Sequence, residues 1–313
     1  MELRKDYILD RWVIISSVRG KRPHEFKKKI EFEDVKFCFF CPENENSTPP
    51  EIGRVGGKQW KYRWFPNKFP AVEMAGQADI RTDNTFYTFS NAFGKHEIIV
   101  ETPEHNKQLW DLSADDIKGV LKIYIDRINA LRKEPGIKYV AVFKNHGKEG
   151  GTSIVHSHTQ VIAINHVPKA VREEAEASKK FDSCPYCRII ESEKNSYRRC
   201  FENEAFVAFC PYASRFNYEI WVMPKKHFRS IDEMDDPQLG KLAEIMKRIL
   251  AKLRELACSF NFYLHYAPEG DDLHFHIEFA PRIATWAGFE LLTGTIINSV
   301  PPEDAAKFYR GEE

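Results

Sequence analysis

The spacing of apolar residues along the chain predicts two kinds of element. Apolar residues recur every three or four positions over 113–133 and again over 237–258, which is the spacing of one helix face. Ser113 and Asp116 form a capping box at the start of the first helix. Short runs rich in Val, Ile, Phe and Tyr predict strands at 12–17, 96–102, 139–145, 205–213, 218–224 and 261–268. Strands interrupted by two long helices indicate the α+β class.

One further predicted strand carries unusual polar residues. The stretch SIVHSHTQVIAI, residues 153–164, places His156, His158 and Gln160 two positions apart. On a strand such residues share one face. A lone pair of histidines with this spacing is most often a hydrogen-bonded surface pair, so a functional interpretation needs support from the rest of the chain.

That support comes from an internal repeat. Each half of the sequence runs through a CxxC pair, a strand, a single histidine, a long helix, a strand, a glycine-containing loop and an HxH strand. The second HxH strand is LHFHIEFAP, residues 273–281. Two matching orders of seven features predict a pseudo-duplicated fold, in which each unit is an antiparallel sheet with a long helix. We expect the halves to be residues 1–167 and 168–313, joined by a charged helical stretch around 168–182.

Composition narrows the function classes. Lys+Arg and Asp+Glu are both 46, which argues against a protein that binds nucleic acid mainly by neutralising phosphates. The charged N-terminus has no signal-peptide pattern, and no uncharged apolar run approaches 18 residues, so we expect a cytoplasmic protein without a membrane span. Of seven cysteines, four form CxxC pairs, which favours metal sites over disulfides.

The repeat predicts two metal sites. Two thiolates and two imidazoles suit tetrahedral zinc, and each half offers such a set in the same order. The two CxxC pairs lie too far apart in sequence for a zinc ribbon. We therefore expect two zinc ions per chain as structural staples, held by Cys38, Cys41, His105 and His156 and by Cys184, Cys187, His227 and His274.

If His156 binds metal, its neighbour His158 is left for chemistry. Gly147, Gly150 and Gly151 just before it allow close approach of the backbone to an anion, and Ser153 adds a hydroxyl. A neutral imidazole beside phosphate can attack phosphorus without a separate base. Gln160 can hydrogen-bond a phosphoryl oxygen but cannot donate a proton to a poor leaving group, so we expect the leaving group to be a phosphate or sugar phosphate.

With these motifs in place, nearly the whole chain resembles the galactose-1-phosphate uridylyltransferase family, a branch of the histidine-triad superfamily. The resemblance rests on the segments RKDYILDRWVIISSVRGKRP, CFFC, FPNKFPAV, ETPEHN, NHGKEGGTSIVHSHTQ, PKKH, LHFHIEFAP and AGFE. It implies two histidine-triad-like units, with His158 as the uridylylated nucleophile and Gln160, Ser153 and Asn145 on the phosphates. It also implies that Asn67 and Phe69 hold the nucleobase and ribose, that Arg19 and Arg22 reach phosphates, in part across a homodimer interface, and that Glu290 binds hexose hydroxyls.

Two departures from the family pattern leave alternatives open. Bacterial members use a Glu and three histidines for an iron-type second site, a set that Glu174, His265, His274 and His276 could supply. The CPYC pair favours zinc instead. After Glu290 the stretch LLTGTIINSVPPEDAAK lacks the glutamine of bacterial enzymes and is more similar to the ADP-glucose phosphorylase branch.

The resemblance implies an enzyme that acts in two steps. UDP-glucose gives its nucleotidyl group to His158, and a hexose-1-phosphate then accepts it. The alternative is a phosphorylase that transfers an adenylyl group from ADP-glucose or a dinucleoside polyphosphate to inorganic phosphate. A zinc scaffold without catalysis would leave His158 and the glycine-rich loop without a role, and Gln160 disfavours a hydrolase.

Overall fold

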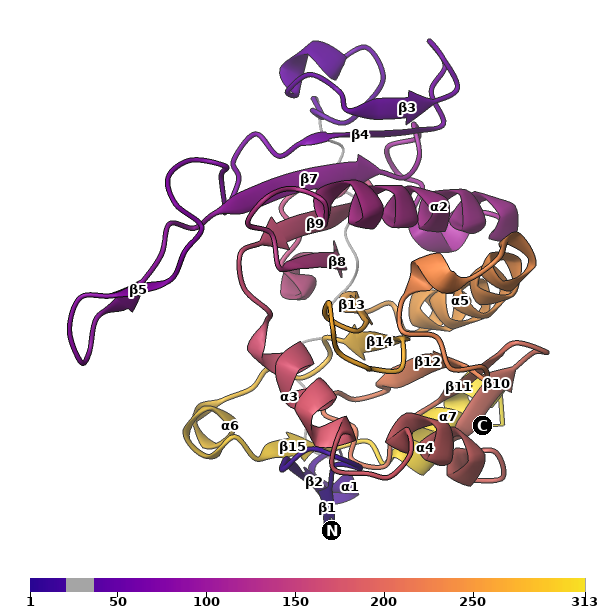
Figure 1. Ribbon diagram of the computed structural model, residues 1–313. Coiled ribbons are helices and arrows are strands. Elements are labelled where there is room, and N and C mark those ends of the chain that lie inside the picture. Colours follow the sequence, from indigo (N-terminus) through magenta and orange to yellow (C-terminus); the bar gives the residue numbers. More distant parts are fainter. Residues whose placement is uncertain (21–36, 313) are drawn as a thin grey trace. The chain divides into compact units, whose positions relative to one another are not determined.

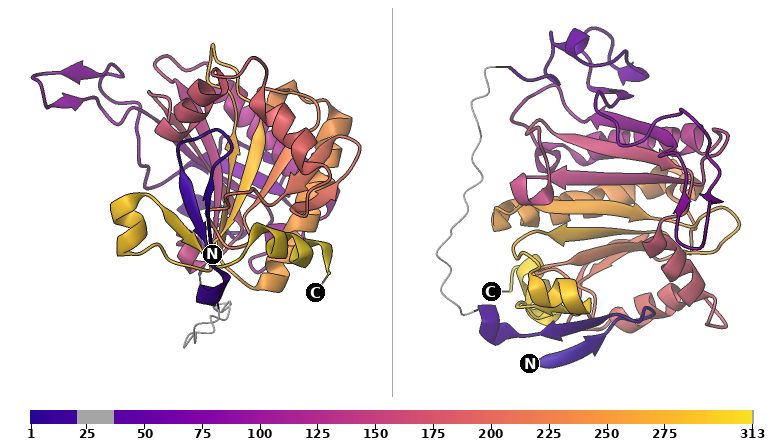
Figure 2. Two further views of the ribbon diagram at one scale, coloured as in Figure 1. Left: turned by 90° about the horizontal axis from the view of Figure 1, so that it is seen from below. Right: turned by 90° about the vertical axis from the view of Figure 1, so that its left-hand side faces the viewer.

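The computed structural model describes residues 1–20 and 37–312 of the chain. These residues form two compact units, each described on its own below. The Cys38 unit comprises residues 37–144 and 153–169, and the Cys184 unit comprises residues 1–20, 145–152 and 170–312. Figures 1 and 2 give three views of the ribbon.

The Cys38 unit is built on an antiparallel sheet with the order β8-β9-β7-β4-β3. Its strands are β3 (Gly53–Val55), β4 (Tyr62–Pro66), β7 (Gly94–Val100), β8 (Tyr139–His146) and β9 (His158–Ile164). Helix α2 (Ala114–Leu131) begins at the predicted Ser113–Asp116 capping box and buries the predicted apolar face. The small elements are η1 (Glu45–Ser47), η2 (Leu109–Asp111) and the hairpin β5 (Arg81–Thr82) with β6 (Thr88–Phe89), which projects from its sheet as an arm (Figures 1 and 2).

The Cys184 unit repeats this topology. Its main sheet has the antiparallel order β13-β14-β12-β11-β10. The strands are β10 (Arg199–Glu202), β11 (Phe206–Phe209), β12 (Ile220–Pro224), β13 (Phe260–His265) and β14 (His276–Pro281). The long helix α5 (Asp236–Leu256) joins β12 to β13, as α2 joins β7 to β8. In both units the strand after the long helix is followed by the HxH strand, which lies second in the sheet, so the predicted α+β duplication is confirmed.

The remaining elements of the Cys184 unit include both ends of the described chain. A second sheet has the order β1-β2-β15, formed by β1 (Glu2–Lys5), β2 (Trp12–Ile15) and β15 (Ile296–Asn298). The short elements are α1 (Ser17–Gly20), η3 (Lys148–Gly150), α3 (Lys169–Ser178), α4 (Pro185–Glu193), η4 (Ile231–Glu233), α6 (Gly288–Thr293) and α7 (Pro302–Arg310). The first strands therefore pair with a strand from the end of the chain, whereas the sequence grouped them with the first half; the boundary at residues 167–168 stays a prediction.

Strand β9 is shorter than the apolar pattern predicts. It begins at His158, so His156 lies in the irregular segment before the strand. Strand β14 likewise begins at the second histidine of its pair, His276. Among the described residues, no helix combines the length and apolarity needed to span a bilayer.

Candidate active site and metal centres

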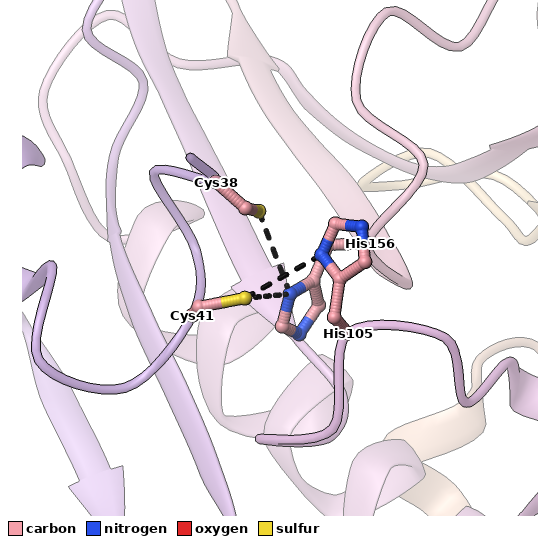
Figure 3. Close-up of side chains that lie close together, drawn as sticks. All are labelled: Cys38, Cys41, His105 and His156. Carbon is pink, nitrogen blue, oxygen red and sulfur yellow. Dashed lines mark hydrogen bonds between the residues drawn. The ribbon is translucent and has the colours of Figure 1, made fainter. Parts of the chain in front are cut away.

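The four predicted metal ligands of the Cys38 unit lie together (Figure 3). The Sγ atom of Cys41 is 3.4 Å from His105 Nδ1 and 3.5 Å from His156 Nδ1, and Cys38 Sγ is 3.7 Å from His156 Nδ1. Zinc bonds of about 2.3 Å to sulfur and 2.0–2.1 Å to nitrogen, at the tetrahedral angle, separate two such ligand atoms by about 3.6 Å. The observed spacing therefore fits a tetrahedral metal ion.

Hydrogen bonding and charge also fit a cation at this point. His156 Nε2 donates to the carbonyl of Thr102 at 2.7 Å, which leaves Nδ1 unprotonated toward the thiols. Burial and then the neighbouring Cys38 raise the pKa of Cys41 to about 11. A divalent cation among the four atoms would favour the thiolate form that these surroundings otherwise oppose.

The second predicted set forms the same arrangement in the Cys184 unit. Cys184 precedes α4 and Cys187 lies in its first turn. Cys187 Sγ is 3.4 Å from His274 Nδ1 and 3.6 Å from His227 Nδ1, and Cys184 Sγ is 3.8 Å from His274 Nδ1. His274 Nε2 donates to the carbonyl of Pro224 at 2.9 Å, as His156 does to Thr102. Both sets therefore fit the same kind of ion.

A third buried cluster contains three of the four residues that could supply the iron-type site. Glu174, His265, His276 and Glu278 lie together, whereas His274 faces the thiols. His265 Nδ1 is 2.7 Å from Glu174 Oε2, and the guanidinium of Arg215 donates to Glu278. Arg215 thus places a permanent positive charge against the carboxylate that a cation would use.

His158 is held in one tautomer by the backbone. Its Nδ1 lies 2.8 Å from the carbonyl of His156, which can only accept a hydrogen bond, so Nδ1 carries the proton. In the neutral ring the lone pair then lies on Nε2. Burial, and after it the charge of Lys144, lowers the pKa of His158 to about 4, so the ring is neutral at pH 7. A neutral imidazole with a free Nε2 lone pair is a nucleophile.

A buried ion pair fixes the strand around His158. Lys144 Nζ donates to Glu101 Oε2 at 2.6 Å and to the His158 carbonyl at 2.9 Å. The hydroxyls of Ser157 and Thr159, on either side of His158, donate to the same carboxylate at 2.5 and 2.6 Å. Lys144 and Glu101 are almost completely buried, so sequence patterns for surface charge gave no signal for them.

Gln160 lies on β9 with His158 and contacts a histidine that the sequence analysis did not select. Gln160 Oε1 is 2.9 Å from Nε2 of His96 on β7. The side-chain nitrogen of Asn67 lies 3.2 Å from His96 Nε2 and 3.4 Å from Nδ1. Asn67 Oδ1 accepts from the backbone N–H of Phe69, whose ring is 83% exposed. Asn67 and Gln160 thus both contact His96, and Phe69 is linked to them through the hydrogen bond from its backbone N–H to Asn67.

The other predicted substrate residues divide between the two units. Ser153 belongs to the Cys38 unit, whereas Arg19, Asn145, Gly151 and Glu290 belong to the Cys184 unit. Arg22 lies outside the described residues. Within the Cys184 unit, Asn145 Oδ1 accepts from Asn261 Nδ2 at 2.8 Å, and Gly151 has a φ of 83° that favours glycine.

Glu290 lies at the start of α6. Its carboxylate accepts from the N–H of Ala287 at 2.9 Å, and it lines a pocket with Arg215, Phe216 and Trp286. Glu290 and Arg215 thus place a carboxylate and a guanidinium on the wall of one pocket.

Comparison with known proteins gives the chain its relatives. The protein-family model described as galactose-1-phosphate uridyl transferase, N-terminal domain, matches residues 2–168. A second family model, described as a domain of unknown function (DUF4921), matches residues 93–308. ADP-glucose phosphorylase of Arabidopsis thaliana is 33% identical over 99% of this chain and 92% of its own. Galactose-1-phosphate uridylyltransferase of Thermotoga maritima is 28% identical over 100% of this chain and 99% of its own. The crystal structure of the Arabidopsis thaliana ADP-glucose phosphorylase with bound ADP-glucose superposes with a TM-score of 0.85 at 32% identity and covers 99% of this chain and 98% of the other. These matches confirm the resemblance inferred from the motifs.

Proposed function

Since the chain belongs to the galactose-1-phosphate uridyl transferase family and is a nucleotidyltransferase, we propose that it transfers the uridylyl group of UDP-glucose to a hexose-1-phosphate through a covalent bond to His158. The observation that carries the proposal is the hydrogen bond that His158 Nδ1–H donates to the His156 carbonyl, because it leaves the ring's lone pair on Nε2. That nitrogen attacks the α-phosphorus of the nucleotide sugar. The bond from phosphorus to the bridging oxygen breaks, and its electron pair leaves with glucose-1-phosphate.

The second step reverses the first with a different acceptor. A phosphate oxygen of the incoming hexose-1-phosphate, galactose-1-phosphate in this proposal, attacks the nucleotidyl group, and the bond to Nε2 breaks. A sugar phosphate leaves as a stable anion without a proton, so the residue beside the nucleophile needs to donate a hydrogen bond and not a proton. Gln160, an amide two residues from His158 on β9, meets that need.

Metal binding has a structural role in this proposal. The donor sets fit two zinc ions per chain, one in each Cys2His2 cluster. When bound, zinc holds its ligands in place, and with four protein ligands it leaves no open position for substrate. His156 is one of these ligands, and its backbone carbonyl accepts a hydrogen bond from His158 Nδ1–H. Metal binding therefore fixes the acceptor that orients the nucleophile.

The proposal extends to assembly and location. The seven cysteines all lie in the described part of the chain and none of them forms a disulfide, which suits a reducing compartment and supports a cytoplasmic enzyme. We include a homodimer, in which Arg19 and Arg22 reach phosphates as the family resemblance implies. The mass of the native protein in solution tests the dimer.

A second candidate is adenylyl transfer from ADP-glucose to inorganic phosphate. The observation that favours it is the 33% identity to the Arabidopsis thaliana ADP-glucose phosphorylase over 99% of this chain. The chemistry at His158 is the same, because the α-phosphorus and the leaving sugar phosphate are the same in both nucleotide sugars. The two candidates differ in the base that is held and in the second acceptor.

Intact-protein mass spectrometry distinguishes these functions. The enzyme is mixed with UDP-glucose or ADP-glucose, free sugar phosphate is removed, and the protein is weighed. A uridylyl adduct that galactose-1-phosphate discharges supports the first function, and an adenylyl adduct that inorganic phosphate discharges supports the second. Product formation at a normal rate without any adduct would contradict both, because direct transfer between substrates would then be required.

A further inference from the structure

The orientation of the Gln160 amide decides whether Gln160 can serve the reaction. Its two ends are nearly equal in size, but only the nitrogen end can donate to a phosphoryl oxygen. With its oxygen end turned toward the phosphoryl group, the side chain would place one lone pair against another. Something must therefore select one orientation, and β9 itself offers no such contact among the hydrogen bonds of Gln160.

His96 supplies the selection through its tautomer. The backbone N–H of Ala71 donates to His96 Nδ1 at 3.2 Å. A backbone N–H can only donate, so Nδ1 is unprotonated, and a neutral ring then carries its proton on Nε2. The Asn67 side-chain nitrogen lies 3.2 Å from Nε2 and 3.4 Å from Nδ1, so the tautomer is assigned by the Ala71 N–H and not by Asn67.

The protonated nitrogen fixes Gln160. His96 Nε2 lies 2.9 Å from Gln160 Oε1, and an N–H at that distance requires the oxygen end of the amide. The two residues are diagonal neighbours across the β7–β9 ladder, where His96 pairs with Ile162 and Ile98 pairs with Gln160. His96 is only 8% exposed, and burial lowers its pKa, so the ring stays neutral as the arrangement requires.

We propose that His96 is a positioning residue for nucleotidyl transfer, which turns the nitrogen end of Gln160 toward the phosphoryl group on His158. The chain of contacts runs from Ala71 N–H through His96 to Gln160, and every donor and acceptor in it is determined by the backbone at its start. The inference rests on the proposed function, since the orientation of the Gln160 amide matters only if a phosphoryl group is bound to His158. His96 itself does not touch the reacting atoms in this proposal.

A double-mutant cycle tests the proposal. The rate at which His158 is labelled in a single turnover is measured for wild type, His96→Ala, Gln160→Ala and the double variant. We expect His96→Ala to slow labelling by about 10- to 100-fold, the effect of misplacing a catalytic group. We expect Gln160→Ala to slow it at least as much. The double variant should be no slower than Gln160→Ala alone, because His96 acts only through that amide.

Controls separate this inference from the proposed function. His166→Ala removes an exposed histidine of the same unit and should label at the wild-type rate. His96→Gln, which can offer an amide N–H to Gln160, should recover part of the lost rate, and it replaces His96→Ala in the cycle if the alanine variant does not fold. Provided that the wild type is labelled, two results would overturn the inference. One is a double variant whose labelling rate falls by the product of the two single effects, and the other is a normal labelling rate in both His96 variants. A wild type that never labels would instead overturn the proposed function.

Discussion

The HxH segments of the two units share the hydrogen bonds of their histidines but differ in the residue that follows. In each, Nε2 of the first histidine donates to a backbone carbonyl, that of Thr102 in one unit and of Pro224 in the other. Also in each, Nδ1 of the second histidine contacts the carbonyl of the first, at 2.8 Å for His158 and 3.0 Å for His276. The local sequence thus repeats both the candidate metal ligand and the orientation of the second histidine ring.

The two strands differ at the residue two positions after the second histidine, which is Gln160 in one and Glu278 in the other. Gln160 meets a neutral His96, which leaves one end of its amide for a ligand. Glu278, at the matching position, is paired with Arg215. The histidine pair alone therefore does not distinguish the two strands, whereas the residue two positions further does: it is a neutral amide after His158 and a carboxylate paired with Arg215 after His276.

The largest effect should come from removing the nucleophile. We expect His158→Ala to lower nucleotidyl transfer by more than about 1,000-fold, as loss of a covalent nucleophile does. The variant should keep its metal, because His156 stays. His276→Ala is the matched change in the Cys184 unit and should still take up label from a nucleotide sugar. Labelling of His158→Ala, followed by mass spectrometry, would place the nucleophile elsewhere.

Loss of a metal ligand should come next. We expect Cys38→Ser and Cys184→Ser each to reduce bound zinc from about two ions to one per chain, and to destabilise the fold by several kcal/mol, since metal binding contributes to folding free energy. Elemental analysis and chemical unfolding measure the two effects. Cys258→Ser changes a thiol outside both clusters and is the control. Iron in the second site, lost in Glu174→Gln but kept in Cys184→Ser, would show that the ligand set is wrong.

The fold and the clustering of the two Cys2His2 sets could be predicted because they depend on local patterns. The capping box at Ser113, the helix periods and the CxxC pairs are all visible in the sequence, and the repeat linked each CxxC pair to its distant histidines. Lys144, Glu101 and His96 could not be found in this way. Their roles depend on cross-strand neighbours, and a single Lys, Glu or His in an apolar strand carries no periodic signal for its partner.

Glu278 offers a test of the second strand by exchange of its charge. Glu278→Gln would change the HxHxE motif to HxHxQ but leave the partly buried Arg215 without the counter-charge of the buried Glu278. We expect a loss of about 3–5 kcal/mol in unfolding free energy, the usual cost of breaking a buried ion pair, and continued labelling at His158. Urea unfolding measures the first and intact mass the second. An unchanged stability would mean that Arg215 is compensated by its contact with Glu219 alone.

A smaller change concerns the lifetime of the intermediate. Gln160→His adds a group that can donate a proton beside His158. We expect it to weaken transfer to sugar phosphate by about 10- to 100-fold, the range for a displaced donor, and to speed loss of the nucleotidyl group to water. Decay of isolated, labelled protein in buffer measures the second effect. Decay no faster than in the wild type would remove the proposed reason for an amide at this position.

The smallest effect is on the pH dependence of stability above pH 6, and it concerns His265 of the Cys184 unit. Burial by itself would lower the pKa of His265, but Glu174 and Glu278 outweigh burial and raise it. A histidine with a raised pKa stabilises the fold fully below its unfolded pKa of about 6.5, and this contribution is lost as the pH rises through the higher folded value. Unfolding free energy of the wild type should therefore fall with a slope of at most about 1.4 kcal/mol per pH unit from this one proton. His265→Asn keeps a donor for Glu174 but does not titrate, so its profile should be flatter over the same range. Urea unfolding from pH 6 to pH 9 makes the comparison, and parallel profiles would show that His265 exchanges no proton on unfolding.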